Sequence, residues 1–141
     1  MNFHIIERIS WKCKKNSFLD RGGVVFDDVP DAIQMVVENY LFNDETPVVA
    51  MFNADSWTVI TDASIITSFN SRITKILHSE IHHTATFGGA EGADKIERID
   101  NTTKILVGKN CTPVWTLGGR SCLSMMNLIM MFPLNSGNLP Q

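Results

Sequence analysis

The stretch from residue 56 to 87, SWTVITDASIITSFNSRITKILHSEIHHTATF, constrains the fold of this chain most. It is rich in β-branched and aromatic residues, which fit a pleated and half-buried surface. The pairs Asp62-Ala63 and Asn70-Ser71 interrupt the apolar runs, and Asp and Asn readily form turns. Because side chains alternate across a strand, Trp57 and Val59 should share one face. The pattern predicts short strands joined in an antiparallel meander.

Segments on both sides of this meander also have strand patterns. Apolar residues alternate loosely from residue 3 to 11 and predict a strand, and the polar residues 12–23 predict a loop. A weak break at Ser79-Glu80, which a bulge or a turn would explain, precedes a resumed alternation over 81–87. Pro113 indicates that the last predicted strand lies at an edge of the sheet or that the proline is the first residue of the strand. The remaining predicted strands cover residues 24–26, 48–52, 95–100, 104–107 and 112–117.

Two helices are predicted. The first covers about residues 30–42, because Pro30 suits a first helical turn and apolar residues then recur every three or four positions. The second covers about 121–132, SCLSMMNLIMMF, with a candidate N-cap serine and a stop at Pro133. It is apolar nearly all round, so it must be covered on more than one side. Full burial in the core is one interpretation, and a Met-rich surface that adapts to partners is the other. The methionines of that surface would be Met125, Met126 and Met130.

Length and composition describe one ordinary globular domain. The chain has 141 residues, of which 44% are hydrophobic and 19% charged, so it is long enough to bury a real core. We expect an N-terminal extension over 1–47 that contains the first helix, a barrel-like core over 48–132 and a tail over 133–141. No apolar run approaches the ~20 residues of a membrane span, and no signal-peptide layout opens the chain. We therefore expect a cytoplasmic location.

The three cysteines indicate neither a disulfide framework nor a thiolate zinc site. Their number is odd, and none of them stands in a CxxC spacing. Cys122 lies in the first turn of the predicted C-terminal helix, where the helix dipole would lower its thiol pKa, unless the residue packs into the apolar helix. Neither Cys122 nor Cys111 has a histidine nearby in the sequence, so we assign no catalytic residue.

The succession of short strands closed by one C-terminal helix resembles the pleckstrin-homology-like barrel of small bacterial proteins, over residues 48–132. TVITDASIITSF is similar to the strand–turn–strand segment of that family, SEIHHTATF to the strand that follows, and CLSMMNLIMMF to its capping helix. The resemblance implies an α+β fold, with a half-open barrel or a strongly bent sheet, and a role in binding proteins or phosphoinositides. Lipid-binding members carry Lys and Arg in the loop between the first two strands. The corresponding loop here, residues 53–55, has an acid and no base.

The charge pattern favours a protein partner. The net charge of −3 gives no general attraction to phosphate, so we expect no nucleic-acid partner and no membrane partner. The cluster Lys12, Lys14 and Lys15 is either a small basic patch or a solvated strand edge. We predict a non-enzymatic protein-binding module, one version being an inhibitor or immunity-type protein that covers the basic active site of a toxic enzyme. A second copy of the chain is another possible partner. The acidic residues of such a surface would be Asp27, Asp28, Asp31, Asp44, Glu45 and Asp55.

Two alternative functions come from other classes. If His78, Glu80 and His82 lie on one strand, their side chains point the same way and could bind zinc with a position left open for water. That arrangement would make a metal-binding protein or a metal-dependent enzyme, but a bend at Ser79 would destroy it. His83, on the other face, is expected to be a hydrogen-bonded core residue. The second alternative, a membrane-surface module, follows only from the family resemblance. No cofactor is expected.

Overall fold

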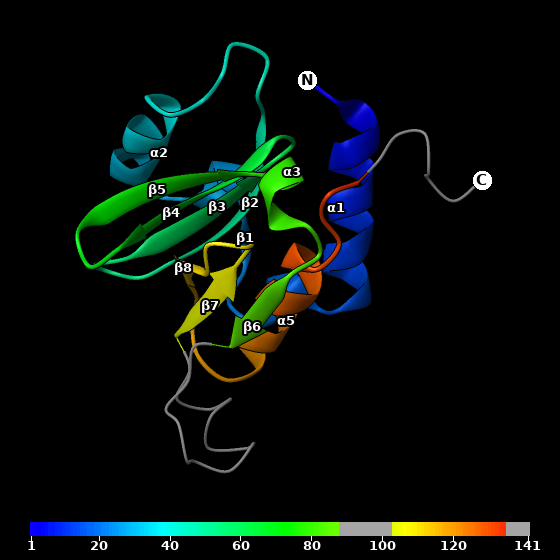
Figure 1. Cartoon of the computed structure of the whole chain (residues 1–141). Coiled ribbons are helices and arrows are strands. Elements are labelled where there is room, and N and C mark those ends of the chain that lie inside the picture. The colour runs from blue at the N-terminus through cyan, green and yellow to red at the C-terminus, as the bar shows by residue number, and fades with distance from the viewer. Residues whose placement is uncertain (88–102, 135–141) are drawn as a thin grey trace.

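The computed structural model describes residues 1–87 and 103–134 and has an α+β fold, as predicted. Figure 1 shows a five-stranded antiparallel sheet in the order β1-β2-β3-β4-β5 and a three-stranded sheet in the order β6-β7-β8. Within these residues, the two sheets do not close into a barrel. The strands are β1 (Val24–Val25), β2 (Pro47–Phe52), β3 (Trp57–Thr61), β4 (Ser64–Phe69), β5 (Arg72–Leu77), β6 (Ala85–Phe87), β7 (Lys104–Val107) and β8 (Thr112–Trp115). The helices are α1 (Phe3–Lys15), α2 (Asp31–Glu38), α3 (His78–Ile81) and α5 (Arg120–Ile129), with the 3-10 turns η1 (Phe18–Asp20) and η2 (Phe26–Asp28).

The predicted meander forms β3, β4 and β5, with turns at the predicted pairs. Asn70 and Ser71 connect β4 to β5 with φ angles of 52° and 63°, the conformation that a tight two-residue hairpin requires. Strand β2 also forms where it was expected. The last strand, β8, lies at an edge of the small sheet, which explains how it accommodates Pro113.

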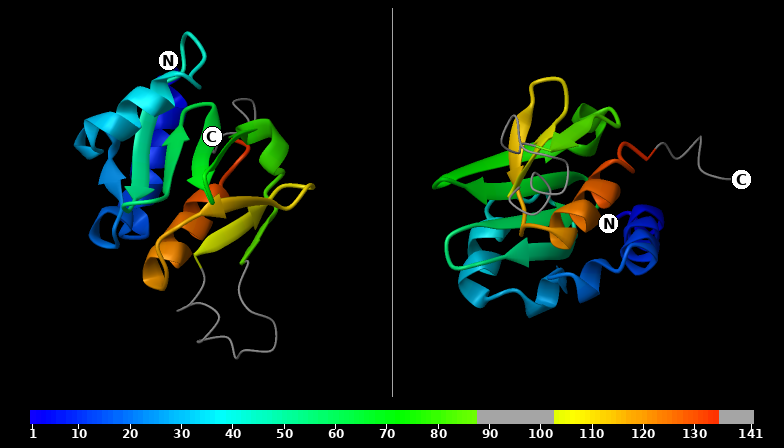
Figure 2. Two further views of the ribbon diagram at one scale, coloured as in Figure 1. Left: turned by 90° about the vertical axis from the view of Figure 1, so that its left-hand side faces the viewer. Right: turned by 90° about the horizontal axis from the view of Figure 1, so that it is seen from below.

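Side chains alternate between two apolar clusters on the two faces of the large sheet. Trp57, Val59 and Ile66 pack against η2 and α2 on one face. Ile60 and Ile65 belong to the larger cluster on the other face, which also contains buried residues of α1, α5 and the small sheet. Figure 2 shows this layering, with α2 on one side of the large sheet and the small sheet and α5 on the other. The large sheet is therefore buried on both faces.

Buried threonines join the two sheets. Thr58 and Thr67 face each other across β3 and β4, with their hydroxyl oxygens 2.7 Å apart. The Trp115 N–H of β8 donates to the Thr67 hydroxyl at 3.1 Å, and the Thr58 hydroxyl donates to the Trp115 carbonyl at 2.6 Å. Because a buried backbone group without a partner is costly, these bonds fix where β8 crosses the large sheet.

The predicted N-terminal strand is wrong, because the segment is helix α1, which extends through Lys15 into the predicted loop. The Asn2 side chain caps its first turn by accepting from the Ile5 N–H at 3.2 Å. Ile9 and Cys13, four residues apart, are both buried against the larger cluster. The apolar residues thus follow a helical period, and the N-terminal segment contributes to the core.

The other differences from the predicted elements are smaller. The strand expected over 81–87 begins only at Ala85, because α3 occupies 78–81 and His82 and His83 have left-handed φ angles of 55° and 54°. Helix α2 ends at Glu38 rather than at residue 42, and α5 ends at Ile129 rather than at 132. Gly119, not the expected serine, is the N-cap of α5. The strand predicted over 95–100 lies outside the described residues.

Candidate functional site

A buried carboxylate fixes the loop between α2 and β2. Glu45 is only 8% exposed, and its Oε1 accepts hydrogen bonds from the Phe42 N–H at 2.9 Å and from the Lys75 ammonium at 2.6 Å. Its Oε2 accepts from the hydroxyls of Thr61 and Ser64. Burial alone would raise the pKa of Glu45, but these donors outweigh burial and hold the pKa below its ordinary value. One ionised side chain therefore ties the loop to β3, β4 and β5.

Lys75 of β5 orients the aromatic ring at the tip of this loop. Its ammonium donates to the Tyr40 carbonyl as well as to Glu45, and it lies 3.5 Å from the centroid of the Phe42 ring. A cation over an aromatic face is attracted by the electron density of the ring. Phe42 nevertheless remains 57% exposed. The loop thus holds a large apolar side chain at the surface in a defined position.

A second buried carboxylate joins the loop to the N-terminal segment. Asp62, in the turn between β3 and β4, accepts from the Thr46 N–H through Oδ1 and from the Asn2 N–H through Oδ2, each at 2.8 Å. Because Asn2 also caps α1, the start of that helix is positioned by the same turn that holds the loop. Three segments far apart in the sequence meet at Asp62.

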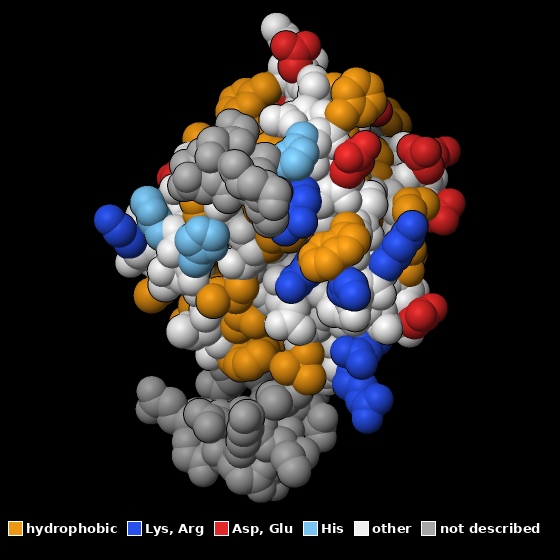
Figure 3. Space-filling view, turned by 90° about the vertical axis from the view of Figure 1, so that its right-hand side faces the viewer, with side chains coloured by type: hydrophobic (Ala, Val, Ile, Leu, Met, Phe, Trp, Pro, Cys, Tyr) orange, Lys and Arg blue, Asp and Glu red, His pale blue; other side chains and the backbone are white. Residues whose placement is uncertain are grey.

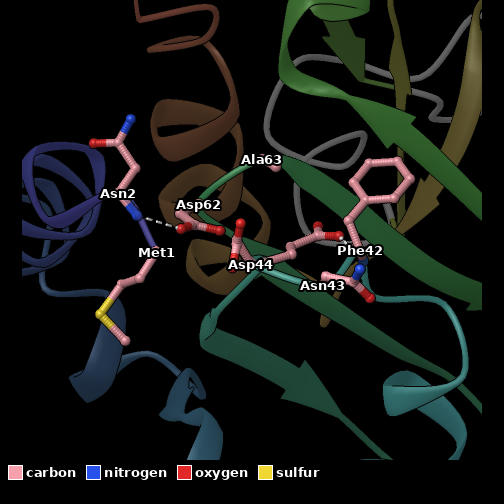
Figure 4. A pocket seen from close by; sticks show the side chains of 8 residues that line it. Met1, Asn2, Phe42, Asn43, Asp44, Asp62 and Ala63 are labelled. Atoms are coloured by element: carbon pink, nitrogen blue, oxygen red, sulfur yellow. Dashed lines mark hydrogen bonds between the residues drawn. The ribbon is translucent and has the colours of Figure 1, made fainter.

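A hollow of about 510 Å³ opens between these segments. Figure 4 shows Asp44 and Asp62 in its middle, with Met1 and Phe42 on opposite sides. We call the exposed residues Met1, Phe42, Asn43 and Asp44 the loop surface. The hollow is lined by Met1, Asn2, Phe42, Asn43, Asp44, Glu45, Asp62 and Ala63.

The exposed groups of this arrangement are of the kind that contact a partner. The hydroxyls of Thr61 and Ser64, which donate to Glu45, belong to fully buried residues that do not line the hollow. The exposed groups are instead apolar side chains beside the carboxylate of Asp44. Aromatic side chains held in place are typical anchors of protein interfaces, because little conformational freedom is lost on binding.

His78, a predicted metal ligand, lies in the core. Its side chain is 7% exposed and stacks on Phe132 with ring centroids 3.7 Å apart. Neither ring nitrogen has a partner of hydrogen-bond geometry within the described residues. Burial lowers the pKa of His78 to about 4, against the opposing influence of the Ser64 and Thr61 backbone and of the Asp62 and Glu45 carboxylates. His78 is therefore neutral at pH 7.

The three predicted metal ligands do not converge. Glu80 and His82 line one hollow beside the turn between β7 and β8, whereas His78 packs in the core because α3 replaces the expected strand. The Glu80 carboxylate accepts from the Leu77 N–H at 3.0 Å. Within residues 1–87 and 103–134, no three His, Cys, Asp or Glu side chains are grouped to hold a metal ion. His83 is hydrogen-bonded to the Met130 carbonyl at 3.1 Å, as expected, but it is exposed rather than buried.

The structure separates the predicted acidic residues. Glu45 is buried and paired with Lys75, so it is not available to a partner. Asp27, Asp28 and Asp31 are exposed around η2 and the start of α2. Asp44 precedes β2, whereas Asp55 follows it, so roughly 20 Å of strand separates these two exposed residues. Asp44 is the exposed member that lines the hollow, and the buried Glu45 lines it as well.

Most of the predicted methionine surface belongs to the core. Met125 is fully buried and Met126 is 9% exposed, because α5 packs between α1 and the small sheet. Only Met130, at the end of α5, is exposed, at 41%. Of the two interpretations, burial in the core fits Met125 and Met126, and surface exposure fits Met130 alone.

The basic cluster predicted at a strand edge lies on the last turn of α1. Lys12, Lys14 and Lys15 complement the negative end of that helix's dipole. Figure 3 shows Lys and Arg side chains around exposed apolar groups on this side of the molecule. Arg8 and Lys15 lie 5.0 Å and 5.6 Å from the Trp11 ring centroid, so the cations and the indole stabilise one another.

The two buried cysteine thiols, Cys13 and Cys122, are not activated. Burial raises the pKa of the Cys13 thiol to about 12. Burial also raises the pKa of the Cys122 thiol, against a smaller opposing hydrogen bond with Thr116, so packing rather than dipole activation describes this residue. Cys111 is exposed in the turn between β7 and β8.

Of the residues that build the site, Asp44 and Glu45 were predicted as partner-binding residues, but Phe42, Asp62 and Lys75 were not. Phe42, Asp62 and Lys75 were read only as a helix end, a turn and a strand residue. The available signal was the sequence FNDE before β2, in which an aromatic residue stands beside acids just outside a helix. One donor to Glu45, the Phe42 N–H, is local, but the three side-chain donors lie 16 to 30 residues further along the chain, so its burial had no local signature.

The chain matches no family model, no curated protein and no solved structure. Within the residues that the structure covers, no helix has the length and hydrophobicity needed to cross a membrane. The proposal for the function of this protein therefore rests on the geometry of the site.

Proposed function

We propose that this protein is a non-enzymatic protein-binding module that contacts its partner through the loop surface. The observation that supports this most is the exposed Phe42 ring, held over Lys75 by a loop that the buried Glu45 fixes. A buried carboxylate is costly unless it is fully paired, and here every partner serves to position the loop. A binding surface arranged in advance loses less entropy on association.

The charge of the surface indicates the kind of partner. Asp44 is exposed beside Phe42, and Lys75, the cation nearest to the ring, is already paired with Glu45. A basic partner with an apolar pocket would complement this surface, and the acid would increase the rate of association. The finer version, an inhibitor or immunity-type protein that neutralises a toxic enzyme, stays a prediction. A cytoplasmic location is part of the proposal and is supported by the three unpaired cysteine thiols.

The test compares the wild-type protein with Phe42→Ala and with the matched control Met35→Ala, which removes an exposed side chain from α2. Each protein is immobilised and incubated with native extract to capture a partner. In a separate experiment, the mass of each free protein in solution is measured by analytical ultracentrifugation. We expect the wild type and Met35→Ala to retain the same stoichiometric partner, or to self-associate equally. Phe42→Ala should weaken binding by about 30-fold, as loss of an aromatic anchor does.

Two results would contradict the proposal. One is a monomeric wild-type protein that retains no stoichiometric partner. The other is a partner that Phe42→Ala binds as tightly as the wild type does, while urea unfolding shows that both variants remain folded. Asp44→Lys separates the charge contribution, because it should slow association and reduce its dependence on salt.

A further inference from the structure

Strand β5 has a free edge. It pairs with β4 on one side, and no strand in the described ranges pairs with its other side. The His78 N–H just beyond β5 donates to Ala63 at the β4 end, whereas the Leu77 N–H donates outward to the Glu80 carboxylate. Because backbone groups alternate in direction along an antiparallel ladder, the N–H and C=O groups of Ile73 and Lys75 also point outward.

Two hollows lie along this edge and share Thr74. The larger, of about 370 Å³, is lined by Phe69, Asn70, Arg72, Thr74, Lys104 and Pro113. The smaller, of about 230 Å³, lies between β5, Glu80, His82 and the turn after β7. Gly108 packs closely against α3 here, because a Cβ on it would lie 2.8 Å from the Glu80 carbonyl oxygen. The β5 edge and the β7–β8 hairpin thus form the walls of a groove, which we call the edge groove.

The described residues of the edge groove carry more positive than negative charge. Arg72 and Lys104 line the larger hollow, and Lys109 lines the smaller one. Among the described residues that line the two hollows, Glu80 is the one acid, and its carboxylate is engaged by the Leu77 N–H. Charged residues on an edge strand often prevent pairing. Lys75 does not serve that purpose here, because its ammonium is directed to Glu45 and Tyr40.

We infer that the edge groove binds an extended, acidic segment of a partner protein, which adds to the large sheet beside β5. Its backbone would pair with the outward groups of Ile73 and Lys75, in the strand-addition mode of peptide recognition. Every second side chain would face the cations of the groove, and glutamate or aspartate there would complement them. A second copy of β5 carries Arg72 and Lys75 and no acid, so it would not complement the cations of the groove. This inference concerns a different surface from the loop surface and does not depend on it.

The test uses a soluble peptide of alternating threonine and glutamate, matched in length to β5, with a threonine–lysine peptide as the charge control. Backbone amide signals of the full chain are followed by NMR during titration. We expect the acidic peptide to shift the Ile73 and Lys75 amides and to slow their hydrogen exchange. Arg72→Glu combined with Lys104→Glu should weaken binding by about tenfold or more, whereas the control Lys14→Glu on α1 should leave it unchanged.

Ile73→Pro provides the backbone control. It removes an outward N–H that would pair with the acidic peptide, so it should weaken binding, and proline is tolerated on an edge strand. Should this variant fail to fold, the charge-reversal pair still decides the matter. Equal binding of the two peptides, or shifts confined to α1 or the loop surface, would overturn the inference. So would the absence of any shift at millimolar acidic peptide. A partner lost with Phe42→Ala but indifferent to the edge variants would support the loop surface alone.

Discussion

His78 should make the protein lose stability in mild acid. Burial lowers its pKa from 6.5 to about 4, so the unfolded chain takes up this proton at a higher pH than the folded protein does. The stabilising contribution is therefore complete above pH 6.5 and is lost as the pH falls towards 4. At about 1.36 kcal/mol per pH unit, the loss reaches roughly 2 kcal/mol at pH 5 and about 3 kcal/mol at pH 4.

The carboxylate of Glu45 acts in a lower pH range. Its pKa is depressed in the folded state, so its contribution is present above the unfolded value of 4.5 and is lost as the pH falls below it. The interval from pH 6.5 to 5 therefore reports mainly on the buried imidazole. Asp62 and Glu45, the acids that influence His78, favour its protonated form, but burial outweighs them.

The assay is urea unfolding at pH 7.5 and pH 5.0. The wild type should lose roughly 2 kcal/mol of unfolding free energy between the two conditions, and His78→Phe, which can still stack on Phe132, should lose much less. His4→Phe on the exposed face of α1 is the matched control and should behave as the wild type does. The reasoning is refuted if the wild type is equally stable at both values of pH, or if His78→Phe loses as much as the wild type.

Three further outcomes are expected from the buried polar groups and the thiols. Glu45→Gln should lower the unfolding free energy by about 2–4 kcal/mol at pH 7.5 in urea unfolding, because the partly buried Lys75 loses its counter-charge. Thr67→Val should lower it by about 1–3 kcal/mol in the same assay, because the Trp115 N–H loses its acceptor. With a thiol reagent followed by absorbance, only Cys111 should react rapidly in the folded protein, because the other two cysteines are buried.

Matched variants separate these effects from general surface changes. Glu38→Gln on α2 and Thr86→Val on β6 alter exposed side chains and should change the unfolding free energy by less than about 0.5 kcal/mol. A Glu45→Gln protein as stable as Glu38→Gln would show that the carboxylate network does not fix the loop. Rapid modification of all three thiols without denaturant would contradict the packing of α1 and α5.

Local patterns predicted the parts of the fold that local physics controls. The meander and its turns were predicted because β-branched alternation and turn residues act over a few positions, as at Asn70-Ser71. The segment that became α1 was misassigned, because Phe3, Ile5, Ile9 and Trp11 match a loose strand as well as a helix. Trp11 and Phe3 remain exposed, while Ile9 is fully buried. Packing against the core selected the helix.

The candidate site lay beyond local reasoning for a similar reason. The acidic residues of the predicted surface were chosen by charge alone, yet Glu45 is buried, because Thr61, Ser64 and Lys75 supply donors from three different strands. His78 was expected to share a strand face with Glu80, but α3 directs the imidazole to Phe132 instead.

The amino-acid sequence by itself determined the strands of the large sheet, the alternation of their side chains and the strong apolarity of the C-terminal helix. These follow from the identity of neighbouring residues, through side-chain alternation and turn preference. Only the tertiary structure decided which carboxylates are buried, which aromatic ring stays exposed and which strand edge stays free. Such outcomes depend on partners as far away as the 60 residues between Asn2 and Asp62, and burying a charge is favourable only where folding brings those partners together.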